Sequence, residues 1–369
     1  MKQRKWLQMV CALTMAATVS FAMPLPTEAI SLGSILDGVS GIANEAKAYK
    51  ELNEQIHYYN ETEEGRQELF QEYKTKTGVV YNPEREEQLD DIMARLTEGI
   101  AATDPSIYDK PYLYYLTPDP TFNAACSFGH VMYVNVGTFS LTNNIDEIAV
   151  VLGHEMGHGQ KSHVAHALKK KAVTALGAAI VAGSLSGDAL KENLLAVVVN
   201  QIDTVQIGRK DEWEADNLSF DYIYHGGYNP GATAAIWQRV IDMQGDNSSN
   251  FVGEIFSPSD HPSNTQRRDN YEKKISELSG KHVTIKKGTD TVQINGKDFV
   301  TPAAAAGMTQ AERKYFVMGN LAAAYDHKQN KEAAVNDNGT VKLGNQAIIT
   351  PMNGDPSADD LAALLNKIK

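Results

Sequence analysis

Apolar side chains recur every three or four positions along much of the chain before residue 245, and this spacing predicts a mainly helical region. Asn82 followed by Pro83 is typical of a helix start, as is Asn144 ahead of an acidic first turn. Gly226 and Gly227 are typical of a helix end. The predicted helices cover residues 34–75, 83–102, 145–158, 204–225 and 230–244.

Two regions show the pattern of strands instead. Residues 111–139 contain short β-branched or aromatic runs that Pro, Asp and Gly interrupt. From residue 280 onward apolar and polar positions alternate, Asn295-Gly296 indicates a hairpin, and Thr309 with Glu312 forms a capping box. We therefore predict a large domain over residues 30–278 and a small C-terminal α+β module over residues 280–369, and we identify no repeat of 20–50 residues.

The N-terminus has the three parts of a secretory signal peptide. Three cations within the first five residues precede an apolar run over residues 6–22, and small residues follow. We predict a signal peptide over residues 1–29, cleaved after Ala22 or after Ala29. The alternative is an anchor that stays in the membrane, but the run is shorter than the ~20 residues that a span needs. A second apolar stretch, residues 172–185, is also short, which favours a buried helix or hairpin over a span.

Composition and charge narrow the function further. The chain has 369 residues, of which 42% are hydrophobic and 22% charged, and this balance is typical of a folded globular protein. Its net charge of −12, without a cluster of Lys and Arg, argues against nucleic-acid binding. Loss of the signal peptide leaves Cys126 as the only cysteine, so the exported chain has no intrachain disulfide. We expect it in the periplasm, at the cell surface or secreted.

The stretch VVLGHEMGHGQ carries the strongest chemical signal. His154 and His158 are four residues apart and share one helix face, so both imidazoles can reach one cation. Glu155 lies about 100° round the helix axis, where its carboxylate can meet a water on that cation. Zinc binds such ligands in open tetrahedral sites, and it lowers the pKa of bound water to about 7, so that Glu155 can take the proton at neutral pH.

The third ligand decides between two types of zinc site. One type places a glycine three residues after the second histidine and a histidine three further on, but here those positions hold Lys161 and Val164. His163 misses the required offset by one residue. The other type takes a Glu from a later helix, and Glu212 with Asp216 supplies two carboxylates on one helix face.

Several ordered motifs resemble one family. NAAC, VMYVNVG, IDEIAVVLGHEMGH, EWEAD, GGYNP and HPSNTQR follow one another as in HtpX/BepA-type zinc metallopeptidases of metallopeptidase family 48, the group that includes the CAAX prenyl protease. The resemblance covers roughly residues 45–275. It implies an α+β fold: a mainly helical zincin of the gluzincin type with a short sheet. The HtpX branch is membrane-embedded, and this chain is more similar to the soluble, exported members because it lacks long apolar segments.

The resemblance also implies a role for each matching residue. His154, His158 and Glu212 would bind one Zn²⁺ ion per chain, with Glu155 as the general base. Asp216 would accept the second ring proton of a ligating histidine.

Two further motifs of the family bear on substrate. His261 and Arg267 match the HPxxxxR segment, whose histidine lies over the metal and either binds zinc in a latent state or holds the oxyanion during turnover. Asn123 and Ala124 match a strand that is similar to an edge pairing with extended substrate backbone. Ala125 replaces the aromatic residue common there, so side-chain preferences do not transfer.

These features predict a zinc-dependent metalloendopeptidase that hydrolyses polypeptides, with misfolded or stalled envelope proteins as substrates. The alternative is a latent or inactive zinc-binding scaffold or chaperone-like envelope protein. A cysteine protease is excluded because Cys126 has no identifiable base partner. Residues 280–369 either dock to the cell wall or an envelope partner, or form a stabilising cap on the catalytic domain.

Overall fold

The computed structural model describes residues 47, 50–169, 199, 207–244 and 262–369. The predicted signal peptide, the apolar stretch 172–185 and His261 lie outside these residues. The chain divides into two compact units. The first comprises Met1–His57 and Leu168–Ala196, and the second Tyr58–Ala167 and Val197–Lys369. In the first unit, residues 50–57 are helical. No described helix is long and apolar enough to cross a membrane.

The second unit begins with two capped helices. Thr62 accepts a hydrogen bond from the Gly65 amide and starts α3 (Glu63–Thr77), and Asn82 caps α4 (Pro83–Ala101), whose first residue is the predicted proline. The sequence predicted one helix across residues 34–75. That prediction was wrong at Thr62, where the chain turns. Gly65 is needed there, because a Cβ would lie 2.2 Å from the carbonyl oxygen of Tyr58.

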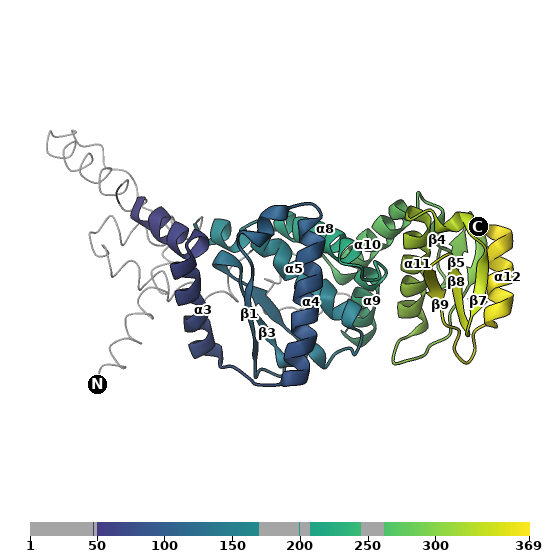
Figure 1. Cartoon of the computed structure of the whole chain (residues 1–369), viewed down its shortest axis with the longest axis horizontal. Coiled ribbons are helices and arrows are strands. Elements are labelled where there is room, and N and C mark those ends of the chain that lie inside the picture. Colours follow the sequence, from purple (N-terminus) through teal and green to yellow (C-terminus); the bar gives the residue numbers. More distant parts are fainter. Residues whose placement is uncertain (1–46, 48–49, 170–198, 200–206, 245–261) are drawn as a thin grey trace, which may run out of the picture. The chain divides into compact units, whose positions relative to one another are not determined.

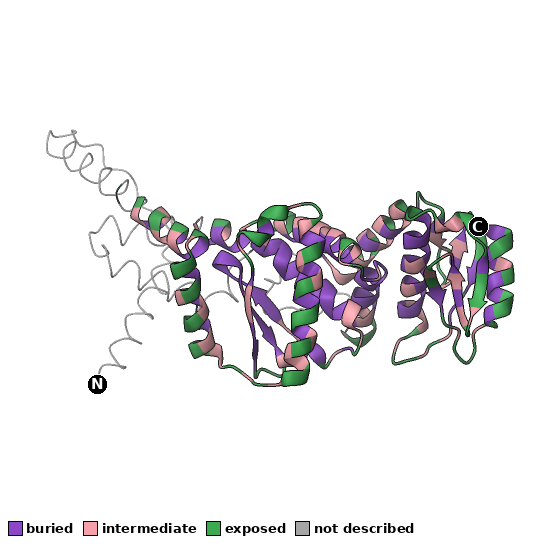
Figure 2. Cartoon of the chain, in the orientation of Figure 1, coloured by how far each residue is buried: buried purple, intermediate pink, exposed green. Residues whose placement is uncertain are grey.

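A three-stranded sheet follows, as the sequence predicted. Parallel β1 (Leu113–Thr117) and β3 (Val131–Asn135) lie side by side, and β2 (Ala124–Cys126) pairs antiparallel with the other side of β3. Every residue of β3 is buried (Figure 2). Since β2 pairs only with β3 in the described part of the chain, its second side is an edge of this sheet.

Four further helices follow. They are α5 (Ile145–Gln160), α8 (Arg209–His225), α9 (Ala232–Gln244) and α10 (Asn264–Leu278), all visible in Figure 1. Of these, α5 packs against β2, while the other three pack on α5 or on one another. α8 begins five residues later than predicted. α10 was not predicted at all, although Ser263 and Gln266 form a complete capping box at its start.

Small residues allow α5 and α8 to approach closely. A Cβ on Gly157 would lie 3.1 Å from the Cα of Ala215, and a Cβ on Gly153 would lie 3.2 Å from the hydroxyl oxygen of Ser219. The Ser219 hydroxyl donates a hydrogen bond to the carbonyl of Val150 at 2.9 Å. The two helices therefore pack almost backbone to backbone, which places their polar residues within reach of one another.

The C-terminal residues form two small sheets and two helices. The first sheet consists of β4 (Val283–Ile285), β5 (Val292–Ile294) and β6 (Lys297–Val300), and it is followed by α11 (Gln310–Asp326). The second consists of β7 (Ala334–Asp337), β8 (Thr340–Leu343) and β9 (Gln346–Ile349), and it is followed by α12 (Ala358–Ile368). Both sheets are antiparallel meanders. These elements complete an α+β chain that is mostly helical with small sheets.

These two halves are copies of one unit, so our expectation of no internal repeat was wrong. Residues 291–302 read TVQINGKDFVTP and residues 340–351 read TVKLGNQAIITP. Each copy has an irregularity at the same place, between Val292 and Gln293 and between Val341 and Lys342. Each also joins its first and last threonine through their hydroxyls, at 2.7 Å in the first copy and 2.9 Å in the second. Only some positions are identical, which hid the repeat from inspection of the sequence.

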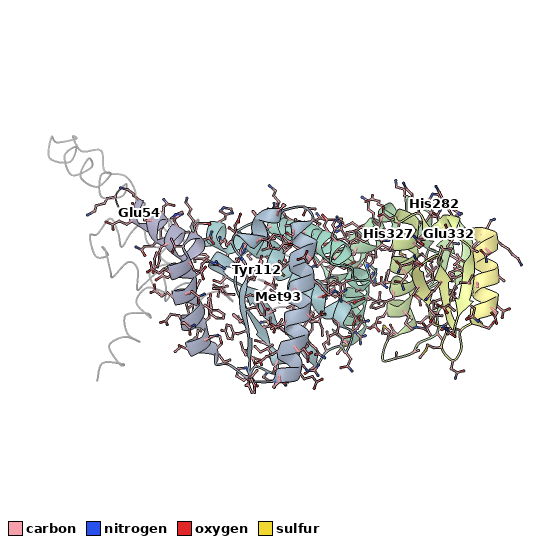
Figure 3. All side chains as sticks on the ribbon, viewed as in Figure 1. Glu54, Met93, Tyr112, His282, His327 and Glu332 are labelled. Carbon is pink, nitrogen blue, oxygen red and sulfur yellow. The ribbon has the colours of Figure 1, made fainter. Side chains whose placement is uncertain are left out.

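α11 packs against α9 and α10 and joins the repeated part to the first 278 residues. Asn229, in the loop before α9, donates hydrogen bonds at 3.0 Å to the Phe316 carbonyl and to the Asn320 side chain. His327, which follows α11 and is labelled in Figure 3, lies 3.1 Å from the hydroxyl of Tyr224 on α8. The apolar core is continuous through this contact.

Candidate metal centre

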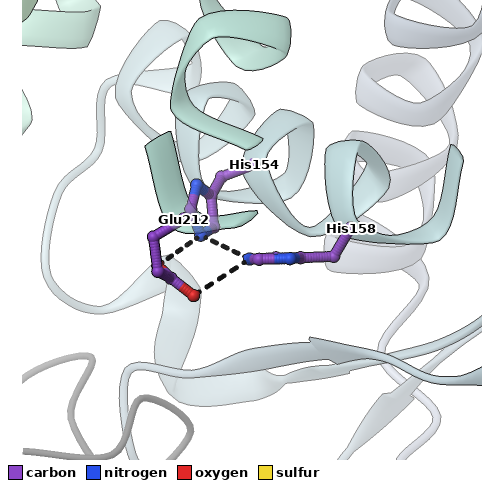
Figure 4. Close-up of side chains that lie close together, drawn as sticks. All are labelled: His154, His158 and Glu212. Atoms are coloured by element: carbon purple, nitrogen blue, oxygen red, sulfur yellow. Dashed lines mark hydrogen bonds and ion pairs between the residues drawn. The ribbon is translucent and has the colours of Figure 1, made fainter. Parts of the chain in front are cut away.

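Three buried side chains from α5 and α8 converge on one point. The Nε2 atoms of His154 and His158 are 3.0 Å apart. The two carboxylate oxygens of Glu212 lie 3.5 Å from His154 Nε2 and 3.4 Å from His158 Nε2 (Figure 4). The four-residue spacing on α5 and the close α5–α8 packing together produce this arrangement.

The arrangement fits a zinc ion. Two imidazole nitrogens and one carboxylate form a donor set of catalytic zinc sites. In a tetrahedral site with bonds of 2.0–2.2 Å, neighbouring donor atoms lie about 3.3–3.5 Å apart. The distances from the two Nε2 atoms to the Glu212 carboxylate, 3.5 Å to one oxygen and 3.4 Å to the other, are close to that spacing, and the Nε2 atoms themselves are slightly closer together at 3.0 Å. Three protein ligands leave a fourth position for water or substrate.

Glu155 lies beside this cluster and faces the sheet. Its Oε2 accepts a hydrogen bond from the Cys126 amide at 3.2 Å. Its Oε1 is buried and has no hydrogen-bond partner among the described residues. Burial raises the pKa of the Glu155 carboxyl to about 7, with opposing effects from His154, which lowers it, and Glu212, which raises it. A carboxyl with such a pKa can both accept and return a proton near neutral pH.

His154 is oriented through its other ring nitrogen. Its Nδ1 lies 3.0 Å from Asp216. Arg267 on α10 donates to Asp216 from Nε at 2.8 Å and also from its Nη2, and the Tyr271 hydroxyl donates to Asp216 at 3.1 Å. Although burial alone would raise the pKa of Asp216, Arg267 and His154 hold it below its usual value. His154 Nδ1 therefore lies 3.0 Å from an ionised carboxylate, which can accept its proton, and also 3.0 Å from Nη2 of Arg267.

The two histidines differ in their surroundings. Burial alone would lower the pKa of His154, and Arg267 acts in the same direction, but Asp216 and Glu212 raise it to about 9. For His158, burial dominates and lowers the pKa to about 4. The Nδ1 of His158 lies 2.8 Å from Nδ1 of His163. From the sequence, His163 was excluded as a zinc ligand because of its offset, and no other role was predicted for it.

The two residues predicted to pair with substrate, Asn123 and Ala124, differ in the direction of their backbone groups. The backbone of Asn123 is occupied, since its carbonyl accepts from the Asn135 amide at 2.9 Å and from the Thr138 hydroxyl at 2.6 Å. Antiparallel strands alternate hydrogen-bonded and non-hydrogen-bonded pairs, so the next pair along, Ala124 with Val134, directs its backbone groups away from the partner strand. Of the two predicted edge residues, Ala124 therefore presents its backbone at the edge, and Asn123 does not.

An apolar pocket opens next to His154 and Glu155. Arg267 lies at its wall, with the guanidinium carbon 3.8 Å from the ring centroid of Trp237. The apolar side chains that line the pocket are Phe122, Val150, Val151, Ile236, Trp237 and Val240. The position of His261 relative to the cluster lies outside the described residues.

Comparisons with known proteins find similarity to peptidases. The sequence model of Peptidase family M48 matches residues 83–274. The chain is 28% identical over 189 residues to Metalloprotease LoiP of Escherichia coli (strain K12), a match that covers 49% of this chain and 70% of that protein. It is 24% identical over 208 residues to the beta-barrel assembly-enhancing protease of Yersinia pestis, covering 48% of this chain and 42% of the relative.

A third relative is mitochondrial. The chain is 24% identical over 193 residues to the mitochondrial metalloendopeptidase OMA1 of Saccharomyces cerevisiae (strain ATCC 204508 / S288c), covering 50% of this chain and 54% of OMA1. The chain thus spans less than two thirds of the latter two relatives. All three matches concern only about half of this chain.

Proposed function

The chain belongs to peptidase family M48, and we propose that it is a zinc-dependent endopeptidase whose ion is held by His154, His158 and Glu212. Membership of the family, together with relatives named a metalloprotease and a metalloendopeptidase, makes the chain a metalloendopeptidase. The observation that carries the zinc assignment is the convergence of two Nε2 atoms, 3.0 Å apart, with the Glu212 carboxylate, of which one oxygen lies 3.5 Å from His154 Nε2 and the other 3.4 Å from His158 Nε2. The predicted gluzincin type of zincin fold belongs to the same proposal.

In the proposed mechanism the zinc ion would activate water and the scissile carbonyl, and residues of the chain transfer the proton and orient the ligands. Bound zinc would lower the pKa of water to about 7 and polarise the scissile carbonyl. Glu155 takes a proton from the attacking water through Oε1, which has no hydrogen-bond partner among the described residues, while the Cys126 amide holds Oε2 in place. Glu155 then returns the proton to the leaving amine. Asp216 keeps the Nε2 lone pair of His154 directed at the metal by accepting the Nδ1 proton.

The neighbouring surfaces support a polypeptide substrate. The backbone of Ala124 points away from β3, and an extended substrate strand would pair with it once this edge, buried in the structure, becomes accessible; such pairing recognises main chain rather than sequence. The apolar lining beside Glu155 favours an apolar over a polar substrate side chain next to the scissile bond. Misfolded or stalled envelope proteins remain the proposed substrates. Export through the signal peptide, to the periplasm or the cell surface, is proposed with them.

We also propose that residues 280–369 stabilise the peptidase rather than act as a separate docking module. The hydrogen bonds from Asn229 to α11 and the continuous apolar core favour this role. Arg239 on α9 lies 3.4 Å from buried Glu147 at the start of α5 and 3.5 Å from Glu312 at the start of α11. These ion pairs link the helix of the metal centre to the repeated part.

The test combines metal content with cleavage. We expect the purified chain to contain one zinc ion and to cleave casein at internal bonds. Glu155→Gln should retain zinc and lose cleavage, whereas Glu87→Gln, an exposed change on α4, should retain both. A chain without zinc contradicts the proposal. Zinc binding with no cleavage in the wild type would favour the scaffold alternative.

A further inference from the structure

A turn after α5 brings a third histidine back to the metal centre. α5 ends at Gln160, and residues 163–169 are helical again. On a continuous helix, residues five apart point about 140° away from each other and do not meet. Ser162 has a φ of 51°, in the left-handed region, which redirects the chain at this point. As a result, the Nδ1 atoms of His158 and His163 lie 2.8 Å apart.

The other ring nitrogen of His163 faces α8. Nε2 lies 3.4 Å from Glu214 Oε2 and 4.0 Å from Asp211 Oδ1. The His163 side chain is only 4% exposed, while the two carboxylates are partly exposed. The same helix supplies Glu212, so α8 contacts both ends of the two-histidine chain.

His163, Asp211 and Glu214 could by composition hold a second cation, because their donor atoms lie within 4.8 Å of one another. The positions of the ring protons on His158 and His163 argue against a second cation here. A neutral His158 that binds zinc through Nε2 carries its proton on Nδ1, and this proton fills the 2.8 Å gap to His163. His163 must accept it on Nδ1 and therefore carries its own proton on Nε2. That proton occupies the position that a second cation would need.

We propose that His163 is a positioning residue that fixes the ring of His158 for metal binding, and that Glu214 in turn holds His163. This inference rests on the proposed zinc site. Each ligating histidine then has its own acceptor: Asp216 for His154 and the neutral imidazole of His163 for His158. Glu214 accepts the Nε2 proton of His163.

Zinc affinity, measured by competition with a chelator, tests this role without using activity. His163→Leu fills a similar volume but removes the acceptor, and we expect zinc affinity to fall about 10–100-fold. His163→Asn places an amide oxygen near the lost Nδ1 and should restore most of the affinity. The matched control is His166→Leu, on the same short helix but exposed, which should bind zinc like the wild type.

A second measurement does not depend on the folding of any variant. Nitrogen-15 spectra of the zinc-loaded wild type should show His163 protonated on Nε2 and unprotonated on Nδ1. The inference is overturned if His163→Leu binds zinc as tightly as the wild type, if His163→Asn is as weak as His163→Leu, or if a second zinc binds His163 Nε2. A wild type that binds no zinc overturns the proposed function itself, which separates the two failures.

Discussion

Replacing Gly319 by Ala tests whether α11 is docked on the peptidase as the structure describes. Gly319 lies inside α11, where its backbone meets the loop before α9. A Cβ at this position would lie 2.2 Å from the Gly231 nitrogen and 2.7 Å from the Gly231 Cα. Both are backbone atoms, which cannot rotate away as the end of a side chain can.

Two effects of this change have opposite signs. In an undocked helix, Ala in place of Gly stabilises by about 1 kcal/mol. In the docked helix, overpacking costs about 1–3 kcal/mol, and a clash with backbone belongs at the upper end. We therefore expect a net loss of about 2 kcal/mol in the free energy of unfolding.

Urea unfolding of the purified chain, followed by circular dichroism, measures the difference. The matched change Gln310→Ala, in the first turn of α11, involves residues of nearly equal helix propensity and should shift the free energy of unfolding by less than about 0.5 kcal/mol. A Gly319→Ala chain that is more stable than the wild type would refute the docking of α11 and, with it, the stabilising role of residues 280–369.

Further outcomes follow from the metal centre. Asp216→Asn should lower zinc affinity about 10–100-fold in the same chelator competition, and an unchanged affinity would contradict its role in orienting His154. Gly157→Val should abolish casein cleavage because a branched side chain separates α5 from α8, and retained activity would contradict the close packing. Glu155 works as a base only when ionised, so kcat/KM should fall about tenfold per pH unit on the acid side of its pKa. Burial raises that pKa to about 7 and the charge of zinc lowers it, so the fall should begin at or below about pH 7, and a fall that starts above pH 8 would contradict the assignment.

The sequence predicted the parts of the site that depend on local spacing. His154 and His158 share a face because four residues make about one helical turn, and Asn144 caps α5 by accepting from the Asp146 amide. Glu212 could be named because it forms a pair with Asp216 on a second helix. In each case the relevant distance along the chain is short and the geometry of a helix supplies the rest.

What the sequence did not reveal depends on long-range packing or on single dihedral angles. His163 was set aside because its offset fits no straight helix, and only the left-handed turn at Ser162 brings it to His158. α10 lacks a strong apolar stripe, since only Arg267, Tyr271 and Ile275 are buried on it, so its periodicity was weak. Its capping box was present in the sequence and could have indicated the helix.

The duplicated unit near the C-terminus has a consequence for how this part of the chain folds. α11, from the first copy, packs on β9 of the second, and α12, from the second copy, packs on β6 of the first. In Figure 1 the strands of both copies lie between these two helices. The helix of each copy needs a strand of the other copy to complete its packing, so the two copies must fold together as one cooperative unit. During synthesis, when only the first copy has left the ribosome, α11 therefore still lacks its contact with β9.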